Sequence, residues 1–292
     1  MSPKPTVRTL RTRKRRHGAE PIVMVTAYDH PTATIASAAG VDLILVGDTV
    51  GDNVLGYADT LHVTIEDMEH HVAAVARAKP DCLVVGDMPW MSYHVSAEET
   101  VRNAARLIRA GAECVKLEGG RKRVRVIEAL INAEIPVMGH VGLTPQSVHA
   151  LGGMRVQGRS VDGATVLLDD AAAIVAAGCF AVVIEGVPDA VGAAVTAAID
   201  VPTIGIGAGP GCDGQVLVFH DVLGLGTRRT AKFVRQYANL AETGTKALAE
   251  FAADVRSGAF PGPAESYEAS DELRHALSQA PDPTGESDPG RR

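Results

Sequence analysis

The chain has 292 residues, of which 46% are hydrophobic, 4% aromatic and 22% charged, and its formal net charge is −7. This length fits one α/β barrel or two smaller domains, and the apolar content is sufficient for a large core. No apolar run approaches the roughly 18–20 residues of a membrane span, and no signal-peptide pattern is present, so we expect a cytoplasmic protein without a membrane partner.

The charge is distributed unevenly along the chain. Seven of the 28 basic residues lie in the first nineteen positions, which leaves 21 basic and 35 acidic residues in the remainder. A nucleic-acid-binding protein should have basic residues along its folded surface, so nucleic acid is not an expected partner. The basic segment fits a solvated terminus or an amphipathic first helix better than a nucleic-acid arm. Its basic residues are Lys4, Arg8, Arg11, Arg13, Lys14, Arg15 and Arg16.

The four cysteines are widely spaced and form no CxxC pair. Neither a disulfide framework nor a zinc site is therefore expected. They are Cys82, Cys114, Cys179 and Cys212.

Short runs rich in β-branched residues alternate with Ala-rich helical segments through most of the chain. Thr64, Ser96 and Thr144 are predicted to begin helices, and Gly40, Gly111 and Gly178 to end them. Eight strands in this alternation predict a (β/α)₈ TIM barrel, with a doubly wound open sheet as the alternative. The predicted strands are 22–26, 42–46, 82–86, 113–117, 135–139, 180–184, 201–205 and 215–218.

The chain is expected to form one domain with an extension at each end. Residues 1–19 are predicted as a basic extension that leads into the first helix, and 20–262 as the barrel with its C-terminal helices. Residues 263–292 are predicted as a tail, largely disordered from about 278, because Ser, Pro, Gly, Asp and Glu dominate there.

Polar residues that end apolar strands are the first candidates for a site, because barrel active sites lie at the C-terminal ends of the strands. Two strands end alike, in Val-Gly-Asp at Asp48 and Val-Gly-Asp at Asp87. A single Asp at such a point more often caps the following helix. Two matched instances on neighbouring strands favour a pair of converging carboxylates, which suits Mg²⁺.

The fourth strand adds Lys116 and Glu118, which share one face because strand side chains alternate. Helices cover the outside of a barrel, so this pair is expected to face the interior. The pair could form a mutual ion pair with no further task. The functional interpretation gives Glu118 to the metal and Lys116 to a substrate carboxylate, and a Schiff-base lysine is a further alternative.

The remaining candidates lie on the later strands. Glu185 follows five apolar residues, which suits a general base, although a charge in the first turn of a helix is an equal alternative. His140 ends the fifth strand, where a satisfied core imidazole is the favoured interpretation. The glycines of 205–209 suggest a dinucleotide loop only weakly, because a strand and not a helix follows them.

In combination, four segments resemble ketopantoate hydroxymethyltransferases. They are MVTAYD (24–29), VGDT (46–49), GHVGLTPQ (139–146) and GIGAG with DGQ (205–215), and the resemblance runs from about residue 6 to 268. It implies a magnesium-dependent TIM barrel of the phosphoenolpyruvate/pyruvate superfamily, usually a homodecamer. It also implies hydroxymethyl transfer from 5,10-methylenetetrahydrofolate to 3-methyl-2-oxobutanoate, through a metal-stabilised enolate, to give 2-dehydropantoate and tetrahydrofolate in pantothenate biosynthesis.

The resemblance also implies a role for each matching position. The metal positions are Asp48, Asp87 and Glu118. The oxo-acid contacts are Asp48, Thr49, Asp87 and Lys116, and the proton acceptor is Glu185. The family commonly has Ser where this chain has Thr49, so the hydroxyl is kept and we expect substrate binding to persist.

Two other functions fit the same pattern. Another Mg²⁺-dependent oxo-acid C–C lyase on this scaffold typically supplies a cysteine from a mobile loop, and none of the four cysteines has such a context. A non-catalytic barrel should have lost one of the five charged site residues, and all five are present.

Overall fold

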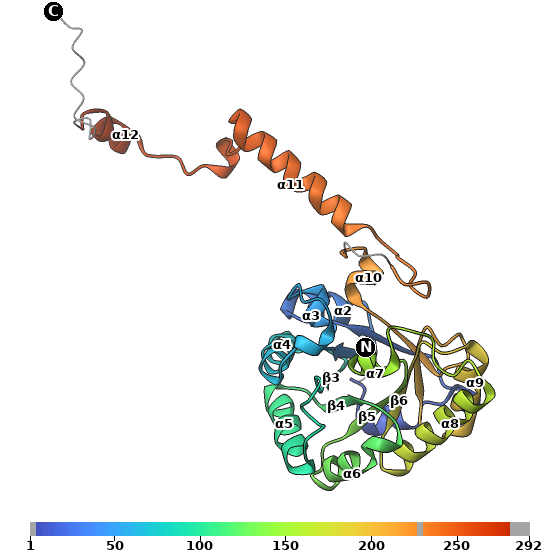
Figure 1. The fold of residues 1–292 in the computed structure, drawn as a ribbon. Helices are drawn as coiled ribbons and strands as arrows, with labels where there is room; N and C mark the ends of the chain where they lie inside the picture. The colour runs from blue at the N-terminus through green and yellow to red at the C-terminus, as the bar shows by residue number, and fades with distance from the viewer. Residues whose placement is uncertain (1–3, 227–229, 281–292) are drawn as a thin grey trace, which may run out of the picture. The chain divides into compact units, whose positions relative to one another are not determined.

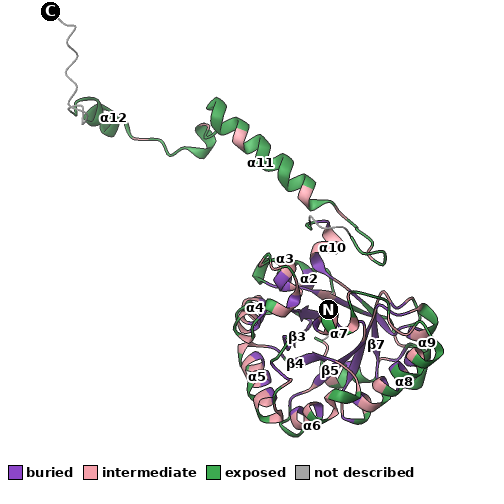
Figure 2. Ribbon diagram, in the orientation of Figure 1, coloured by how far each residue is buried: buried purple, intermediate pink, exposed green. Residues whose placement is uncertain are grey.

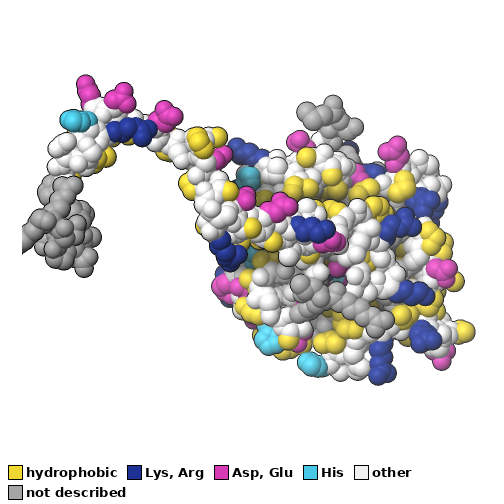
Figure 3. Space-filling model, turned by 90° about the horizontal axis from the view of Figure 1, so that it is seen from above, with side chains coloured by type: hydrophobic (Ala, Val, Ile, Leu, Met, Phe, Trp, Pro, Cys, Tyr) yellow, Lys and Arg dark blue, Asp and Glu magenta, His cyan; other side chains and the backbone are white. Residues whose placement is uncertain are grey.

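The computed structural model describes residues 4–226 and 230–280. The chain divides into two compact units, and the division falls between Asn239 and Leu240. No helix in the described ranges is both long enough and apolar enough to span a membrane. Charged side chains of both signs are spread over the face seen in Figure 3.

Eight parallel strands of the first unit close into a barrel in chain order (Figure 1). The barrel closes where β1 pairs with β8, for example Ile22 with Gly214. The eight predicted strands are confirmed, and the open sheet is excluded. The strands are β1 Ile22–Thr26, β2 Leu43–Val46, β3 Leu83–Asp87, β4 Cys114–Glu118, β5 Val137–Gly142, β6 Ala181–Glu185, β7 Thr203–Ile206 and β8 Gly214–Leu217.

Helices follow the strands and cover the outside of the barrel (Figure 1). The α-helices of this unit are α1 Val7–Arg11, α2 His30–Ala38, α3 Val50–Asn53, α4 Ile65–Arg77, α5 Ala97–Ala110, α6 Val124–Asn132, α7 Val148–Leu151, α8 Val161–Ala176, α9 Asp189–Ala198 and α10 Phe219–Leu223. The 3₁₀ turns are η1 Arg15–His17, η2 Thr60–His62, η3 Arg121–Arg123 and η4 Pro145–Ser147.

Three of the predicted helix boundaries have clear physical causes in the structure, whereas Thr144 precedes the 3₁₀ turn η4 without a side-chain cap. The side chain of Thr64 accepts a hydrogen bond from the Asp67 amide, and that of Ser96 accepts one from the Glu99 amide. Gly111 ends α5 with φ +116°, and a Cβ there would lie 2.4 Å from the Cβ of Ala76. A residue with a side chain would therefore disturb both the backbone and the packing of α4 against α5.

The core has two layers, one on each side of the strands. Buried residues fill the strands and the inward sides of the helices (Figure 2). The outer layer lies between sheet and helices and includes Val84, Val115 and Leu117. The inner layer fills the barrel with residues that alternate with these, such as Val85 and Cys114, and it includes Leu10 of α1. The N-terminal helix thus contributes to the barrel interior.

Part of the basic N-terminal segment is buried in the barrel. Lys14 is 1% exposed, and its ammonium lies 2.7 Å from Asp213 Oδ2 and donates to the carbonyls of Thr196 and Val201. Asp213 immediately precedes β8, so this contact lies at the N-terminal end of the barrel, opposite the expected site. Arg13 and Arg16 form further ion pairs with acidic residues of the barrel. The segment therefore binds to the barrel through buried and exposed ion pairs, and it is not simply a solvated terminus.

The second unit contains α11 Leu240–Ser257, the turn η5 Pro263–Glu265 and α12 Asp271–Ser278. Neither of its α-helices has a buried residue. Most of the stretch predicted to be disordered from about 278 lies outside the described residues. The predicted domain boundaries at 19 and 262 stay predictions.

The buried ion pair predicts a large effect of one substitution. Asp213→Asn should lower the free energy of unfolding by about 3–5 kcal/mol, because it leaves the Lys14 charge buried without its counter-ion. Urea unfolding followed by circular dichroism measures the change. Asp200→Asn removes an exposed partner of Arg16 and is the matched control, for which a much smaller change is expected. Equal effects of the two substitutions would contradict the structural role of Lys14.

Candidate active site

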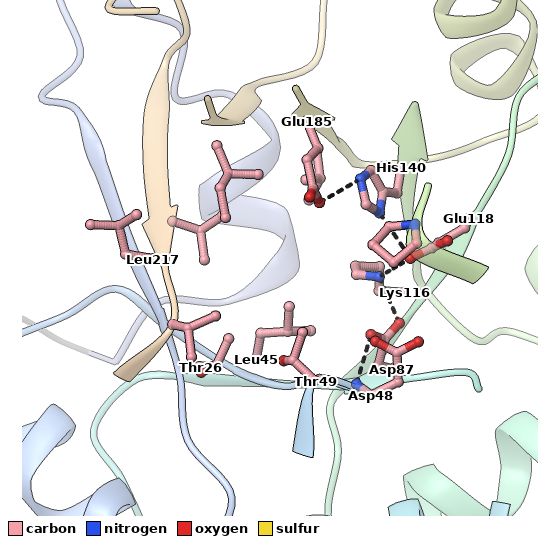
Figure 4. A pocket seen from close by; sticks show the side chains of 16 residues that line it. Thr26, Leu45, Asp48, Thr49, Asp87, Lys116, Glu118, His140, Glu185 and Leu217 are labelled. Atoms are coloured by element: carbon pink, nitrogen blue, oxygen red, sulfur yellow. Dashed lines mark hydrogen bonds and ion pairs between the residues drawn. The ribbon is translucent and has the colours of Figure 1, made fainter. Parts of the chain in front are cut away.

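A pocket lies at the C-terminal ends of the barrel strands (Figure 4). All six residues that the sequence singled out for chemistry line it, and His140 joins them. The six are Asp48, Thr49, Asp87, Lys116, Glu118 and Glu185. Leu45, Val183 and Val216 of the inner core layer form its apolar part. We call it the strand-end pocket.

Lys116 is the cation at the centre of the charged side chains in this pocket. Its ammonium donates to Asp87 Oδ1 at 2.8 Å and lies 3.8 Å from Glu118 Oε1. Burial opposes the charge of this 3% exposed side chain, but the carboxylates of Asp87, Glu118 and Asp48 outweigh it and raise the pKa of Lys116. A raised pKa disfavours the neutral amine that a Schiff-base lysine requires.

Asp48 and Asp87 lie side by side at the ends of β2 and β3. The Asp48 amide donates to Asp87 Oδ2 at 3.2 Å. Burial raises the pKa of both carboxyl groups, and repulsion from Asp87 and Glu118 raises that of Asp48 further. Neither side chain caps a helix, since α3 begins after Thr49 without a side-chain cap. The helix-cap alternative is therefore excluded for Asp48.

Glu118 is held from three sides. Its Oε2 accepts a hydrogen bond from the Gln146 amide at 3.0 Å, and its Oε1 lies 3.4 Å from His140 Nδ1. Burial opposes ionisation, but His140 and Lys116 lower the pKa of Glu118. This carboxylate is therefore ionised within the pocket.

His140 lies between two carboxylates and is not a satisfied core imidazole, which corrects the favoured interpretation of the sequence. Its Nδ1 faces Glu118, and its Nε2 lies 3.3 Å from Glu185 Oε2. Neither nitrogen has hydrogen-bond geometry toward any partner among the described residues. Burial opposes the charged form, but Glu118 and Glu185 raise the pKa of His140 to about 9.

Glu185 ends β6, and Figure 4 shows its side chain directed toward His140 across the pocket. The carboxylate is 15% exposed, more than the other acidic groups of the pocket. The following helix α9 begins at Asp189 with Pro188 at its N-cap. Glu185 is therefore not a residue of the first helical turn, and its carboxylate is available to a ligand.

Sequence reasoning gave no role to Gln146 and Tyr93, which support the acidic residues. The Gln146 side-chain amide donates to Asp48 Oδ2 at 2.8 Å and to the Met88 carbonyl at 3.0 Å, and its oxygen accepts from the Tyr93 hydroxyl. That hydroxyl in turn accepts from the Glu118 amide at 3.2 Å. Gln146 belongs to the GHVGLTPQ segment, which was the available signal, but its partners lie on other loops.

The chemistry of the acidic residues fits a divalent cation. Four carboxyl groups and the side chains of Lys116 and His140 meet in this pocket, and burial with mutual repulsion raises the pKa of Asp48 and Asp87. A bound cation would relieve that repulsion and favour their ionised forms. Within the described ranges, no three acidic, histidine or cysteine side chains form a preformed metal cage. Mg²⁺ commonly takes one or two protein carboxylates and completes its shell with substrate and water oxygens, which Asp48 and Asp87 can accommodate.

The glycines of 205–209 do not form a dinucleotide site. They lie between β7 and β8, and among the described residues no helix begins there. The fingerprint requires a helix directly after the glycine-rich turn.

Comparison with known proteins gives the family and the fold. A family model described as ketopantoate hydroxymethyltransferase matches residues 4–263. The 3-methyl-2-oxobutanoate hydroxymethyltransferase 2 of Bradyrhizobium diazoefficiens is 54% identical over 257 residues, with 88% of each chain covered. The 3-methyl-2-oxobutanoate hydroxymethyltransferase of Moorella thermoacetica is 55% identical over 249 residues, which cover 85% of this chain and 93% of that one.

Solved structures support the same architecture. The crystal structure of 2,3-dimethylmalate lyase, a PEP mutase/isocitrate lyase superfamily member, matches with a TM-score of 0.55 at 18% identity. The match covers 96% of this chain and 95% of that one. At this identity the likeness shows the barrel fold alone.

Proposed function

This chain belongs to the ketopantoate hydroxymethyltransferase family, and we propose that it transfers a hydroxymethyl group from 5,10-methylenetetrahydrofolate to 3-methyl-2-oxobutanoate. The products are 2-dehydropantoate and tetrahydrofolate, which places the reaction in pantothenate biosynthesis. The observation that carries the proposal is identity above 50% over most of the chain to relatives with that name. The convergence of the six candidate residues on one pocket supports it.

Asp48, Asp87 and Glu118 are the residues we assign to Mg²⁺. Lewis-acid polarisation of the substrate's keto oxygen is the chemistry that Mg²⁺ supplies when bound, and it makes the C3 hydrogen more acidic. Gln146 holds Asp48 in place through its side-chain amide and Glu118 through its backbone amide. Such supporting contacts orient ligands and tune the affinity of a metal site.

The other residues act on the oxo acid itself. Lys116 offsets the negative charge of the substrate, and its hydrogen bond fixes Asp87 beside it. Thr49 donates to the substrate carboxylate. Glu185 takes the proton from C3, and C3 then forms a bond to the methylene carbon of the folate. The bonds of that carbon to the two folate nitrogens break, and water supplies the hydroxyl oxygen. The proton from C3 and one from water end on the two nitrogens of tetrahydrofolate. His140 stands beside Glu185 and orients it.

A C–C lyase with a catalytic cysteine has no support in the pocket. None of the four cysteines lines it, and each is buried and free. Burial raises the pKa of Cys82 to about 11 and that of Cys179 to about 12, which disfavours reactive thiolates. Free cysteines also agree with the cytoplasm, which stays our prediction for the location.

Product formation tests the proposal directly. The purified chain should convert 3-methyl-2-oxobutanoate to 2-dehydropantoate only when the folate donor and Mg²⁺ are both present. Removal of the metal with a chelator should abolish the product, and added Mg²⁺ should restore it. Mass spectrometry of the reaction mixture measures the outcome, and absence of product under every condition would refute the assignment.

Glu185→Gln separates proton abstraction from binding. The substitution keeps the shape of the side chain but removes the base, so exchange of the C3 proton for deuterium should fall at least about 100-fold. Affinity for the oxo acid should change little, since Glu185 has no assigned contact with its carboxylate. Proton NMR in heavy water follows the exchange. Glu128→Gln, at a solvent-exposed position of α6, is the control. Retained exchange would remove Glu185 from this role.

We also propose that the chain assembles into a homodecamer, as the family resemblance implies. Leu248, Phe251 and Val255 lie on one side of α11 and are 69%, 52% and 48% exposed. Exposed apolar stripes of this kind mark interaction surfaces. They support association between chains, whereas the number of chains comes from the resemblance.

Substitutions on α11 test the assembly. Leu248→Glu with Phe251→Glu should lower the mass of the particle, because both place charge in the apolar stripe. Light scattering after size-exclusion chromatography measures the mass. Lys246→Glu adds a negative residue on the opposite side of the helix and should leave the mass unchanged. A wild-type mass other than ten chains would contradict the decamer, and an unchanged mass of the double variant would exclude this surface.

A further inference from the structure

Three hydroxyl groups form a buried chain that ends in the strand-end pocket. Thr26 at the end of β1 lies 2.9 Å from the Tyr28 hydroxyl, which lies 2.7 Å from Thr49 Oγ1. Thr26 and Tyr28 are 3% and 1% exposed. Thr26 and Thr49 line the pocket, as Figure 4 shows, whereas Tyr28 is not among its lining residues. No role for Tyr28 has followed from the proposed reaction so far.

The direction of the protons in this chain is set where Thr26 meets Tyr28, because the Thr26 hydroxyl is the donor there. The backbone amide of Phe219 donates to Thr26 Oγ1 at 3.1 Å, and an amide can only donate. The Thr26 hydroxyl then donates its single proton to the Tyr28 oxygen. Tyr28 also has one proton, and Thr49 is its remaining neighbour in the chain. If Thr49 donated instead, the buried Tyr28 proton would have no acceptor, which is costly.

The arrangement that leaves no buried hydroxyl proton without an acceptor has Tyr28 donating to Thr49 Oγ1, in a contact whose distance allows either direction. Within the described part of the chain, the Thr49 hydroxyl has no second hydrogen-bond partner. Its own proton is consequently available to a ligand of the pocket that the side chain lines. A hydroxyl that accepts a hydrogen bond from its neighbour keeps its own proton to donate, which suits a carboxylate oxygen.

The position of Tyr28 is fixed independently of the hydroxyl chain. Its carbonyl accepts a hydrogen bond from His71 Nδ1 at 2.7 Å, and its ring packs against His220 with centroids 5.6 Å apart. Replacement of the phenol oxygen alone should therefore leave the ring in place.

We propose that Tyr28 is a positioning residue that holds the Thr49 hydroxyl as a hydrogen-bond donor to the carboxylate of the oxo acid. This inference rests on the proposed function, because the oxo acid supplies the acceptor. The contact is made equally in the ground state and the transition state, since the carboxylate does not react. Loss of the contact should therefore affect KM more than kcat.

Calorimetric titration of the Mg²⁺-loaded enzyme with 3-methyl-2-oxobutanoate tests the proposal, together with KM and kcat. Tyr28→Phe should weaken affinity and raise KM about 3–10-fold, with kcat within about 2-fold of wild type. Thr49→Val should weaken affinity at least as much. Tyr28→Phe should have no further effect in the Thr49→Val background, because the two residues act through one contact.

Conservative variants separate this role from a general structural one. Thr49→Ser keeps the hydroxyl and should retain affinity, and Tyr28→Phe should weaken binding in that background as it does in wild type. Tyr267→Phe removes a hydroxyl from a fully exposed tyrosine and is the control. If Tyr28→Phe does not fold, Thr26→Val removes the first link and should weaken binding with the same dependence on Thr49.

Additive effects of Tyr28→Phe and Thr49→Val, or unchanged affinity of Tyr28→Phe, would overturn the proposal. A neutron structure of the deuterated enzyme without substrate should show the Tyr28 deuteron directed at Thr49, and the reverse direction would overturn this inference alone. Failure of the wild-type enzyme to bind the oxo acid would instead overturn the proposed function, and the substrate contact of Thr49 with it.

Discussion

The ion pair between Lys116 and Asp87 is the interaction on which the candidate site depends. Three buried carboxylates approach this one ammonium group, and burial alone would favour their neutral forms. His140 and Lys116 together lower the pKa of Glu118, and Lys116 also opposes the rise in the pKa of Asp87 that burial causes. Strand register makes the contact possible, because Asp87 pairs with Lys116 and Glu118 pairs with His140 across adjacent parallel strands. The register of the barrel strands therefore determines which charged side chains of the pocket face each other.

The opposite end of the barrel carries a second buried ion pair with a different consequence. Besides contacting Asp213, Lys14 donates to two backbone carbonyls. Asp213 in turn accepts hydrogen bonds from the Arg15 and Thr203 amides. A buried pair that is fully hydrogen-bonded stabilises one arrangement of the chain, whereas a surplus of carboxylates leaves room for a ligand cation. The two ends thus use the same residue types in opposite ways. At one end the ion pair holds the N-terminal segment against the barrel. At the other end the acidic side chains line a pocket that can accept a ligand cation.

The strands and several residues of the candidate site could be predicted from the sequence, because they depend on patterns among residues close together in the chain. The alternation of β-branched runs with Ala-rich helices gave the eight strands, and the Gly-Asp strand ends pointed to Asp48 and Asp87. Contacts between distant segments could not be predicted in this way. Gln146 reaches Asp48 only because the loop after β5 folds over the end of β2, and Lys14 meets Asp213 from the other end of the chain. His140 was misjudged for the same reason, since the two carboxylates beside it belong to neighbouring strands.

Different kinds of polar side chain reach the pocket from different neighbouring strands. Neutral hydroxyl groups come from β1 and the loop after β2, and the charged residues that we propose for metal and substrate come from β2 to β4. His140 and the proposed base Glu185 come from β5 and β6. Adjacent strands lie about 4.8 Å apart, so groups on successive strands can contact different atoms of one small oxo acid. Gly47 permits this spacing on the hydroxyl side, because a Cβ there would lie 3.1 Å from Thr49 Oγ1. A larger residue at that position would press on the Thr49 hydroxyl, so Gly47 keeps space for this hydroxyl directly beside the Asp48 carboxylate.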